Sequence, residues 1–159
     1  MHKANLDRMI ALADEFFKAK NDPDQIVVDE EIMERLRRIH PATLSEETDQ
    51  DGPIAWMLVI PTTHQVMEQF IRKEISERKL LEMTSLHTSY DALYLCSALV
   101  LPEYRGRGLA KRLAAHAIRA IQNDHPIREL FYWAFSDEGM RLATSIAGEL
   151  RLPVYQREA

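Results

Sequence analysis

The most constraining feature of this sequence is a strand, a glycine-containing turn and a helix that follow one another directly between residues 93 and 121. Residues 93–101 form an apolar run (LYLCSALVL) that predicts a buried strand. After Pro102 and a short basic turn, apolar residues return at helical spacing, at Leu109, Leu113, Ala114, Ala117, Ile118 and Ile121. A strand joined so closely to an amphipathic helix favours an α/β or α+β sheet covered by helices over a helical bundle.

The rest of the chain supplies further elements of both kinds. Apolar spacing predicts helices over residues 5–20, 29–39, 64–83 and 137–149. Apolar runs predict strands over 54–60 and 129–135 and a short edge strand over 152–155. The polar, acidic stretch 42–52 is typical of a surface loop. The order of the strands cannot be read from this pattern.

Size and composition indicate one domain over residues 1–159, with 46% hydrophobic and 28% charged residues. The net charge of −5 argues against general nucleic-acid binding, and the six scattered histidines argue against a metal site. A single cysteine, Cys96, excludes an intramolecular disulfide. With no signal-peptide pattern and no apolar run long enough to span a bilayer, we expect a cytoplasmic protein that does not enter the membrane.

Four positive charges lie where the helix after residue 108 begins, at Arg105, Arg107, Lys111 and Arg112. Cations beside the positive end of a helix dipole are unfavourable unless an anion binds there. Gly106 and Gly108 would let an anion approach the main-chain N–H groups that the first helical turn leaves unpaired. The turn therefore has two interpretations, a phosphate site or an ordinary cationic helix cap.

Residues 99–110 (LVLPEYRGRGLA) resemble the coenzyme A-binding motif of the GNAT superfamily of N-acetyltransferases. Arg105, Gly108 and Ala110 match the family pattern Arg/Gln-x-x-Gly-x-Gly/Ala, and Val100 and Pro102 match the preceding Val-x-Pro. The resemblance implies an acetyltransferase domain with a mixed sheet flanked by helices. It also implies acetyl-coenzyme A as cosubstrate and a small-molecule or peptide amine as acceptor.

By this resemblance, the pyrophosphate would be held by main-chain groups of the turn, and the pantetheine would pair with the end of the preceding strand. The implied cofactor-binding residues are Leu99, Val100, Leu101, Arg105, Gly106, Arg107, Gly108, Leu109 and Ala110. In this family an N–H near a strand bulge polarises the thioester carbonyl, and here that donor is expected near Leu99 or Val100.

The family's usual tyrosine acid is missing, because its position is occupied by Ala143. Tyr155 and Tyr132 are substitutes, although each fits packing or an edge strand equally well. Ser136, at the family's asparagine position, is expected to cap a helix.

The candidates for a general base are Glu103, His87 and Asp91, because they flank the strand that would present the thioester. Each could equally be a solvated or capping residue, and Glu103 could simply offset the neighbouring arginines. Cys96 lies within an apolar strand and is expected to be buried packing rather than a nucleophile.

The chain also departs from the family. The usual first strand is expected to be missing, since only residues 26–28 could supply one, and too few residues follow the last helix for the usual pair of closing strands. We therefore expect the acceptor wall to come from a second subunit in a homodimer, or from the helices at 5–20 and 64–83. The alternative function is a non-catalytic acyl-coenzyme A sensor.

Overall fold

The computed structural model describes residues 2–20, 29–134 and 136–158 and contains one five-stranded mixed sheet. Its order is β1 (Leu44–Asp49), β2 (Gly52–Thr62), β3 (Ala92–Val100), β4 (Glu129–Trp133) and β5 (Val154–Arg157). The strands β1, β2 and β3 are antiparallel, whereas β3, β4 and β5 run parallel. This confirms the predicted sheet with both orientations.

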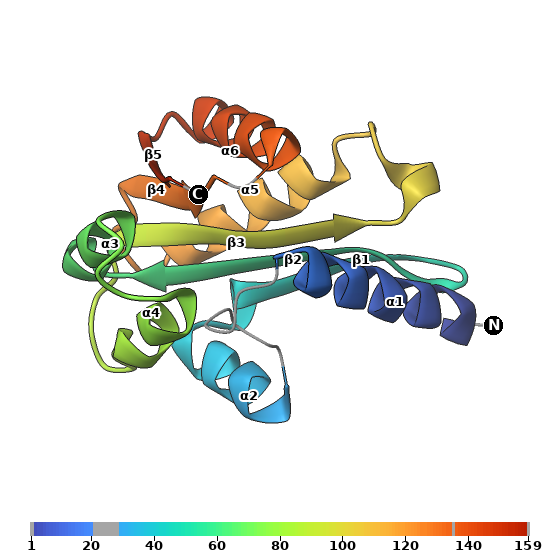
Figure 1. Ribbon diagram of the computed structural model, residues 1–159, viewed down its shortest axis with the longest axis horizontal. Coiled ribbons are helices and arrows are strands. Elements are labelled where there is room, and N and C mark those ends of the chain that lie inside the picture. Colours follow the sequence, from blue (N-terminus) through green and yellow to red (C-terminus); the bar gives the residue numbers. More distant parts are fainter. Residues whose placement is uncertain (1, 21–28, 135, 159) are drawn as a thin grey trace.

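Six α-helices and two short 3₁₀ turns surround the sheet in the described part of the chain. They are α1 (His2–Lys20), α2 (Glu30–Ile39), α3 (His64–Ile71), α4 (Glu77–Met83), α5 (Leu109–Gln122) and α6 (Asp137–Leu150), with η1 (Pro41–Thr43) and η2 (Pro102–Tyr104). α5 packs across β1, β2 and β3, whereas α1 packs on β2 and β3. Figure 1 shows the start of α1, the β1–β2 hairpin and the turn after β3 gathered at one end of the molecule.

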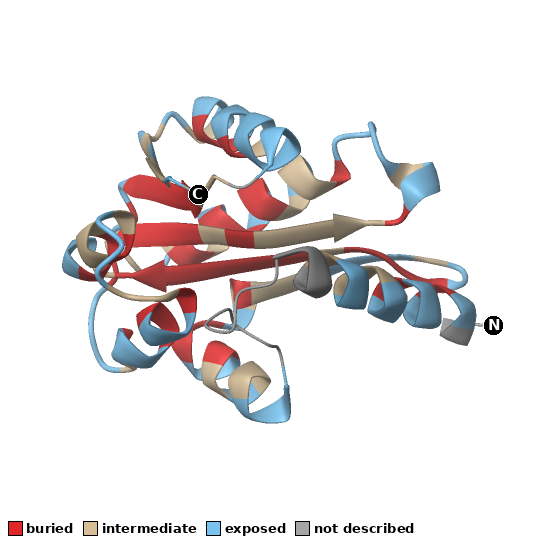
Figure 2. Ribbon diagram, viewed as in Figure 1, coloured by how far each residue is buried: buried red, intermediate tan, exposed pale blue. Residues whose placement is uncertain are grey.

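The main core lies between β2, β3, β4 and the helices that cover them. Its largest fully buried side chains include Tyr90, Tyr94, Phe70 and Phe131. Along β3, burial decreases from the first residues toward Val100, and Figure 2 shows this change from red to tan. The beginning of β3 thus lies in the core, whereas its end near Val100 is partly exposed.

Most helices begin with a side-chain cap. Asp29, Thr63, Ser76 and Ser136 accept hydrogen bonds from the first-turn N–H groups of α2, α3, α4 and α6. Among the α-helices whose preceding residue is described, only α5 lacks a side-chain cap, and it begins after Gly108 in the left-handed conformation. The first N–H groups of α5 are therefore left for another partner.

The prediction of a loop over 42–52 was wrong, because β1 occupies residues 44–49. Its sequence, LSEETD, has no apolar alternation and several exposed side chains. β1 is an edge strand that pairs only with β2, so backbone hydrogen bonds rather than a buried face hold it in place.

Other boundaries also differ from the predictions. β2 continues through Pro61. The pairing with β1 extends only to Leu58 of β2, so Pro61 has no β1 partner that would need its missing N–H. The helical segment 64–83 is divided into α3 and α4, and the last strand lies at 154–157. Residues 26–28, the suggested early strand, lie outside the described residues, and β5 alone follows α6 among the described strands.

Candidate functional site

The sheet opens between β3 and β4. These two parallel strands pair only at Ala92↔Glu129, Leu93↔Leu130 and Tyr94↔Phe131. β3 continues to Val100, whereas β4 ends at Trp133. The second half of β3 therefore has a strand neighbour on one side only, and its other side faces a gap.

Main-chain groups of β3 point into this gap at alternate residues. Leu101 N–H donates to the carbonyl of Ile54 on the β2 side at 2.9 Å. Because main-chain groups alternate in direction along a strand, Leu99, two residues earlier, also directs its N–H and carbonyl toward β2. Ala98 and Val100 are offset by one residue and face away from β2. Consistent with this direction, the Val100 carbonyl accepts a 3.0 Å hydrogen bond from Nε of Arg105.

This geometry revises the predicted pairing with a pantetheine chain. Of the three residues predicted for it, only Val100 directs its main chain into the gap, and Ala98 is the second residue that does so. Leu99 and Leu101 are held by β2, and Leu101 is buried in a second core cluster. The residue that points into the gap depends on strand register, which a single sequence does not reveal.

β3 has a bulge, and it lies before the residues near which the N–H donor was expected. β2 pairs Leu58 with Ser97 and Val59 with Leu95, which leaves Cys96 as the extra residue of β3. Leu99 and Val100, near which the polarising N–H donor was expected, pair regularly with Trp56 and Ala55. The distortion in β3 is therefore centred on Cys96.

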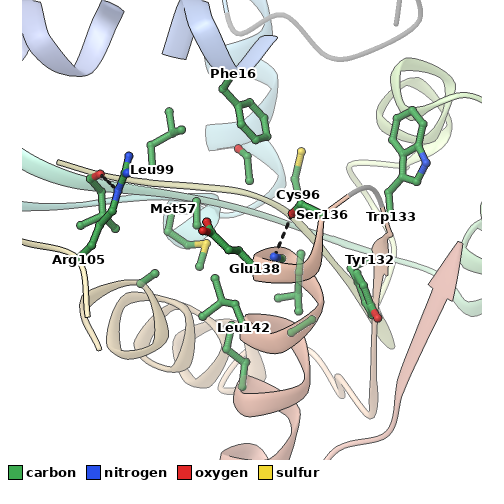
Figure 3. A pocket seen from close by; sticks show the side chains of 18 of the residues that line it. Phe16, Met57, Cys96, Leu99, Arg105, Tyr132, Trp133, Ser136, Glu138 and Leu142 are labelled. Carbon is green, nitrogen blue, oxygen red and sulfur yellow. Dashed lines mark hydrogen bonds between the residues drawn. The ribbon is translucent and has the colours of Figure 1, made fainter. Parts of the chain in front are cut away.

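A pocket of about 500 Å³ occupies the gap. The sheet lines it from Leu95 to Val100 on β3 and at Tyr132 and Trp133 on β4. α1 contributes Leu12, Glu15 and Phe16, and α6 with its N-cap Ser136 contributes Glu138, Leu142 and Ala143, among others. Figure 3 shows Phe16 and Glu138 reaching into the pocket from these two helices.

Of the segments expected to complete the acceptor wall, only α1 lines this pocket. Leu12, Glu15 and Phe16 all lie in the predicted helix 5–20, whereas no residue of α3 or α4 lines this pocket. The homodimer stays a prediction.

The basic turn lies open beside the pocket. Gly106 and Gly108 have φ values of 77° and 73°, in the left-handed region that favours glycine. A Cβ at Gly106 would meet no atom within 4 Å, so space is open above the turn. Among the residues that the structure describes, no backbone carbonyl accepts from the N–H groups of 106–108. Together with the uncapped start of α5, these groups form a cradle suited to an anion.

The arginines of the turn are held around this cradle. Arg107 lies over the Tyr104 ring at 5.1 Å from its centroid, and Arg112 donates to the Arg107 carbonyl at 2.8 Å. Of the remaining predicted cofactor residues, Arg105 and Ala110 line the pocket, and Leu109 is buried in the second core cluster. The turn is therefore an ordered cationic surface that joins the pocket.

α1 is tied to this turn by polar contacts. Arg8 makes two hydrogen bonds to the Glu103 carboxylate, at 2.6 and 2.8 Å. Asp49 accepts from Asn5 at 2.9 Å and from the Tyr104 hydroxyl at 2.5 Å. The Tyr104 hydrogen bond lowers the pKa of Asp49, and the same bond raises the pKa of Tyr104. The helix that walls the pocket is thus fixed to the residues that precede the cradle.

The Arg8–Glu103 pair predicts a pH dependence of stability. Hydrogen bonding from Arg8 lowers the pKa of Glu103 from 4.5 to about 2. Because the folded-state pKa is depressed, the stabilisation is complete above pH 4.5 and is lost as the pH falls toward about 2. We expect Arg8→Gln to lower Tm at pH 7 and the difference from wild type to shrink through this acidic window. A Tm difference that stays constant from pH 6 to the acid limit would contradict this assignment.

None of the four sequence-predicted catalytic candidates lines the pocket. Glu103 is held by Arg8, and Tyr155 is exposed on β5. His87 and Asp91 precede β3 at the end away from the gap. There Asp91 accepts from the His64 N–H at the start of α3 and lies 3.3 Å from Arg128, which is a structural role.

Three other predicted residues do lie at the pocket. Tyr132 is buried, which raises its pKa, and its hydroxyl donates to Gln156 at 2.7 Å. Ser136 caps α6 by accepting from Gly139 N–H at 3.0 Å, as predicted. Ala143 also lines the pocket, so its small side chain leaves room at that position.

Sequence reasoning missed Glu15 and Glu138 at the pocket and Glu77 behind it. Glu77 is 1% exposed and accepts hydrogen bonds from Tyr94 and Cys96. One signal was available, because Glu77 precedes Leu80 and Leu81 by three and four residues and so shares the apolar face of α4. Glu15 and Glu138 carry no comparable signal.

The described residues can also be compared with the requirements for a membrane span and for a metal site. No described helix is both long and apolar enough to cross a bilayer. Within the same residues, no group of three His, Cys, Asp or Glu side chains is placed to hold a metal ion.

Comparisons with known proteins agree with this architecture. A family model described as "Acetyltransferase (GNAT) family" matches residues 10–143. Two crystal structures of an aminoglycoside acetyltransferase, meta-AAC0020, from an uncultured soil metagenomic sample are similar in fold. The complex with trehalose has a TM-score of 0.51 at 14% identity, and the complex with sisomicin has 0.50 at 16%. Each alignment covers 90% of this chain and 79% of the other.

No curated protein gives a significant match to the sequence. The family match nevertheless extends over most of the chain, from α1 through the turn and into α6. This protein belongs to the GNAT acetyltransferase family and is an acyltransferase.

Proposed function

We propose that this protein transfers an acetyl group from acetyl-coenzyme A to a small cationic amine. The observation that carries the proposal is the pocket in the gap between β3 and β4, which connects a cationic, uncapped helix start to a wall containing two carboxylates. A phosphorylated donor fits the first end, and an ammonium group fits the second.

The residues of the turn fit the pyrophosphate of coenzyme A. The N–H groups of 106–108 and the first turn of α5 can donate to phosphate oxygens, with Arg105 and Arg107 adding charge. An extended pantetheine chain can pair with the main-chain groups of Ala98 and Val100 as a partial strand. Coenzyme A, when bound there, supplies an activated acetyl group as a thioester.

The acceptor side of the pocket favours a positively charged molecule. Glu15 and Glu138 come from α1 and α6 and line the same pocket. No hydrogen bond or ion pair joins either carboxylate to another described residue, so both remain available to a ligand. One of the similar crystal structures is a complex of an aminoglycoside acetyltransferase with sisomicin, and an aminoglycoside belongs to this class of amine acceptor.

A non-catalytic acyl-coenzyme A sensor is the alternative, motivated by the missing tyrosine acid at Ala143. Ala143 lines the same pocket as Ser136, Glu138 and Leu142, and its small side chain leaves room there. Room for an acceptor beside the donor favours transfer over sensing.

Release of the coenzyme A thiol tests the proposal. The protein is incubated with acetyl-coenzyme A and a panel of amines that includes sisomicin, spermidine, ethylamine and its weakly basic analogue trifluoroethylamine. We expect thiol release to depend on the amine and to be fastest with the polycationic acceptors. Tight binding of acetyl-coenzyme A with no thiol release on any amine would favour the sensor.

A further inference from the structure

Glu77 is a buried carboxylate directly behind the pocket wall. It begins α4 and is 1% exposed. Its Oε2 accepts a 2.6 Å hydrogen bond from the hydroxyl of Tyr94, which is fully buried. Burial raises the pKa of Tyr94 well above its ordinary value, so the phenol remains a neutral donor. Placing a carboxylate in such a core costs several kcal/mol unless it is well paired, so an apolar residue would serve stability as well.

Cys96 connects this carboxylate to the pocket. The thiol of Cys96 donates to the same Oε2 of Glu77 at 3.8 Å, within hydrogen-bonding range for sulfur. Cys96 also lines the pocket and is the extra residue of the β3 bulge. Glu77 itself does not line the pocket. A thiol is both a weak donor and a weak acceptor, so Cys96 can accept a proton on the pocket side while giving one to Glu77.

Aromatic side chains and Arg157 pack next to Tyr94, the hydroxyl donor to Glu77. The Arg157 guanidinium lies over the rings of Phe70 and Trp133, at 4.4 and 5.0 Å from their centroids, and donates to the Ile75 carbonyl at 2.9 Å. Phe70 also packs on Tyr94, with ring centroids 4.9 Å apart. Tyr94 is thus held by aromatic packing where it donates to Glu77, and the thiol of Cys96 joins Glu77 to the pocket.

We propose that Cys96 and Glu77 form a proton relay that deprotonates the acceptor amine, with Glu77 as the final proton acceptor. This rests on the proposed transfer to an amine. The acceptor enters as an ammonium ion and donates to Sγ of Cys96, while the Cys96 S–H proton passes to Oε2 of Glu77. The result is a neutral amine in the pocket and a protonated Glu77.

The remaining steps of the transfer need no further reactant. The nitrogen lone pair forms a C–N bond with the thioester carbonyl carbon, and the C–S bond breaks with its electron pair on sulfur. The second proton of the nitrogen passes to the departing thiolate. After the amide leaves, the proton on Glu77 returns through Cys96 to solvent. One ammonium ion and one thioester are thus converted to one amide, one thiol and one released proton.

Glu77→Gln keeps an acceptor for Tyr94 and removes the basic group. For a strongly basic amine we expect kcat/KM to fall about 10²–10⁴-fold, the usual contribution of a general base. For trifluoroethylamine, which is already neutral at pH 7, the loss should be less than about tenfold because this amine needs little deprotonation. The Kd for coenzyme A should stay within about twofold of wild type, since the relay does not contact the turn.

A matched control separates the relay from simple burial of a charge. Glu129 is also a buried carboxylate, bonded to His64 at 2.6 Å and outside the pocket. Glu129→Gln should leave kcat/KM near wild type on every amine. If Glu77→Gln matches Glu129→Gln, or loses the same factor on basic and weakly basic amines, the relay is wrong.

Substitutions at Cys96 test the relay independently, even if Glu77→Gln fails to fold. Cys96→Ser keeps a group that both accepts and donates a proton, and should retain most activity. Cys96→Val keeps the volume but carries no proton, and should lose as much as Glu77→Gln, with no further loss in the double variant. Equal activity of the serine and valine variants would overturn the proposal. A wild type without turnover on any amine would instead sink the proposed function, and the relay with it.

Discussion

Gly108→Val is expected to raise the Kd for coenzyme A at least about a hundredfold while the protein stays folded. Gly108 has φ of 73°, where a β-branched residue is strained, and it positions the N–H groups at the start of α5. A changed turn would lose two or more charge-assisted hydrogen bonds to phosphate, each contributing about 1.5–3 kcal/mol. Isothermal titration calorimetry with coenzyme A measures the change.

Gly148→Val supplies the control for this substitution. Gly148 lies within α6 with no positive φ, and a Cβ there would meet no atom within 4 Å. Its substitution should leave the Kd unchanged. Arg105→Glu and Arg107→Glu should also weaken binding, because each places a negative charge beside the phosphates. Unchanged affinity in all three turn variants would refute the cradle.

The unit of β3, turn and α5 was predictable because its local signals agree. An apolar run, two glycines and an amphipathic repeat follow one another in residues 93–121, and each determines its own local conformation. The positive φ values of Gly106 and Gly108 need no information from distant parts of the chain. The cap at Ser136 was accessible for the same reason.

β1 and the position of the bulge were not predictable, because both depend on pairing between distant segments. β1 has a polar sequence and becomes a strand through its ladder with β2. The bulge at Cys96 reflects a change in register between β2 and β3, and nothing in residues 95–97 marks it. Sequence patterns report local periodicity, whereas register is a property of two strands together.

The failed catalytic candidates show how proximity in sequence can mislead. His87 and Asp91 lie just before β3, a nine-residue strand that is about 30 Å long at the usual rise per residue. The gap opens at the other end of β3, so neither residue lies at it. Glu77 is more distant in sequence from the bulge, but α4 brings it to hydrogen-bonding distance of Cys96.

The double reversal Glu15→Lys/Glu138→Lys is expected to raise KM for a polycationic amine about a hundredfold, with kcat and the Kd for coenzyme A little changed. Both carboxylates are exposed at the pocket, so each contributes at most about 1 kcal/mol to a cation through solvent. Reversal removes two attractions and introduces two repulsions, which together make the effect large. Steady-state kinetics with spermidine or sisomicin at low ionic strength gives the size of the change.

The same helix provides the control, and the amine panel separates charge from shape. Glu149 lies on α6 outside the pocket, within 4 Å of Lys111 and Arg119, so Glu149→Lys should leave KM unchanged. With trifluoroethylamine, which carries no charge at pH 7, the double reversal should have little effect, because no ammonium group is present to be repelled. Added salt should reduce the difference for spermidine. An equal rise in KM for charged and neutral amines would mean that the lysines block the pocket. The carboxylates of Glu15 and Glu138 would then not select the acceptor by its charge.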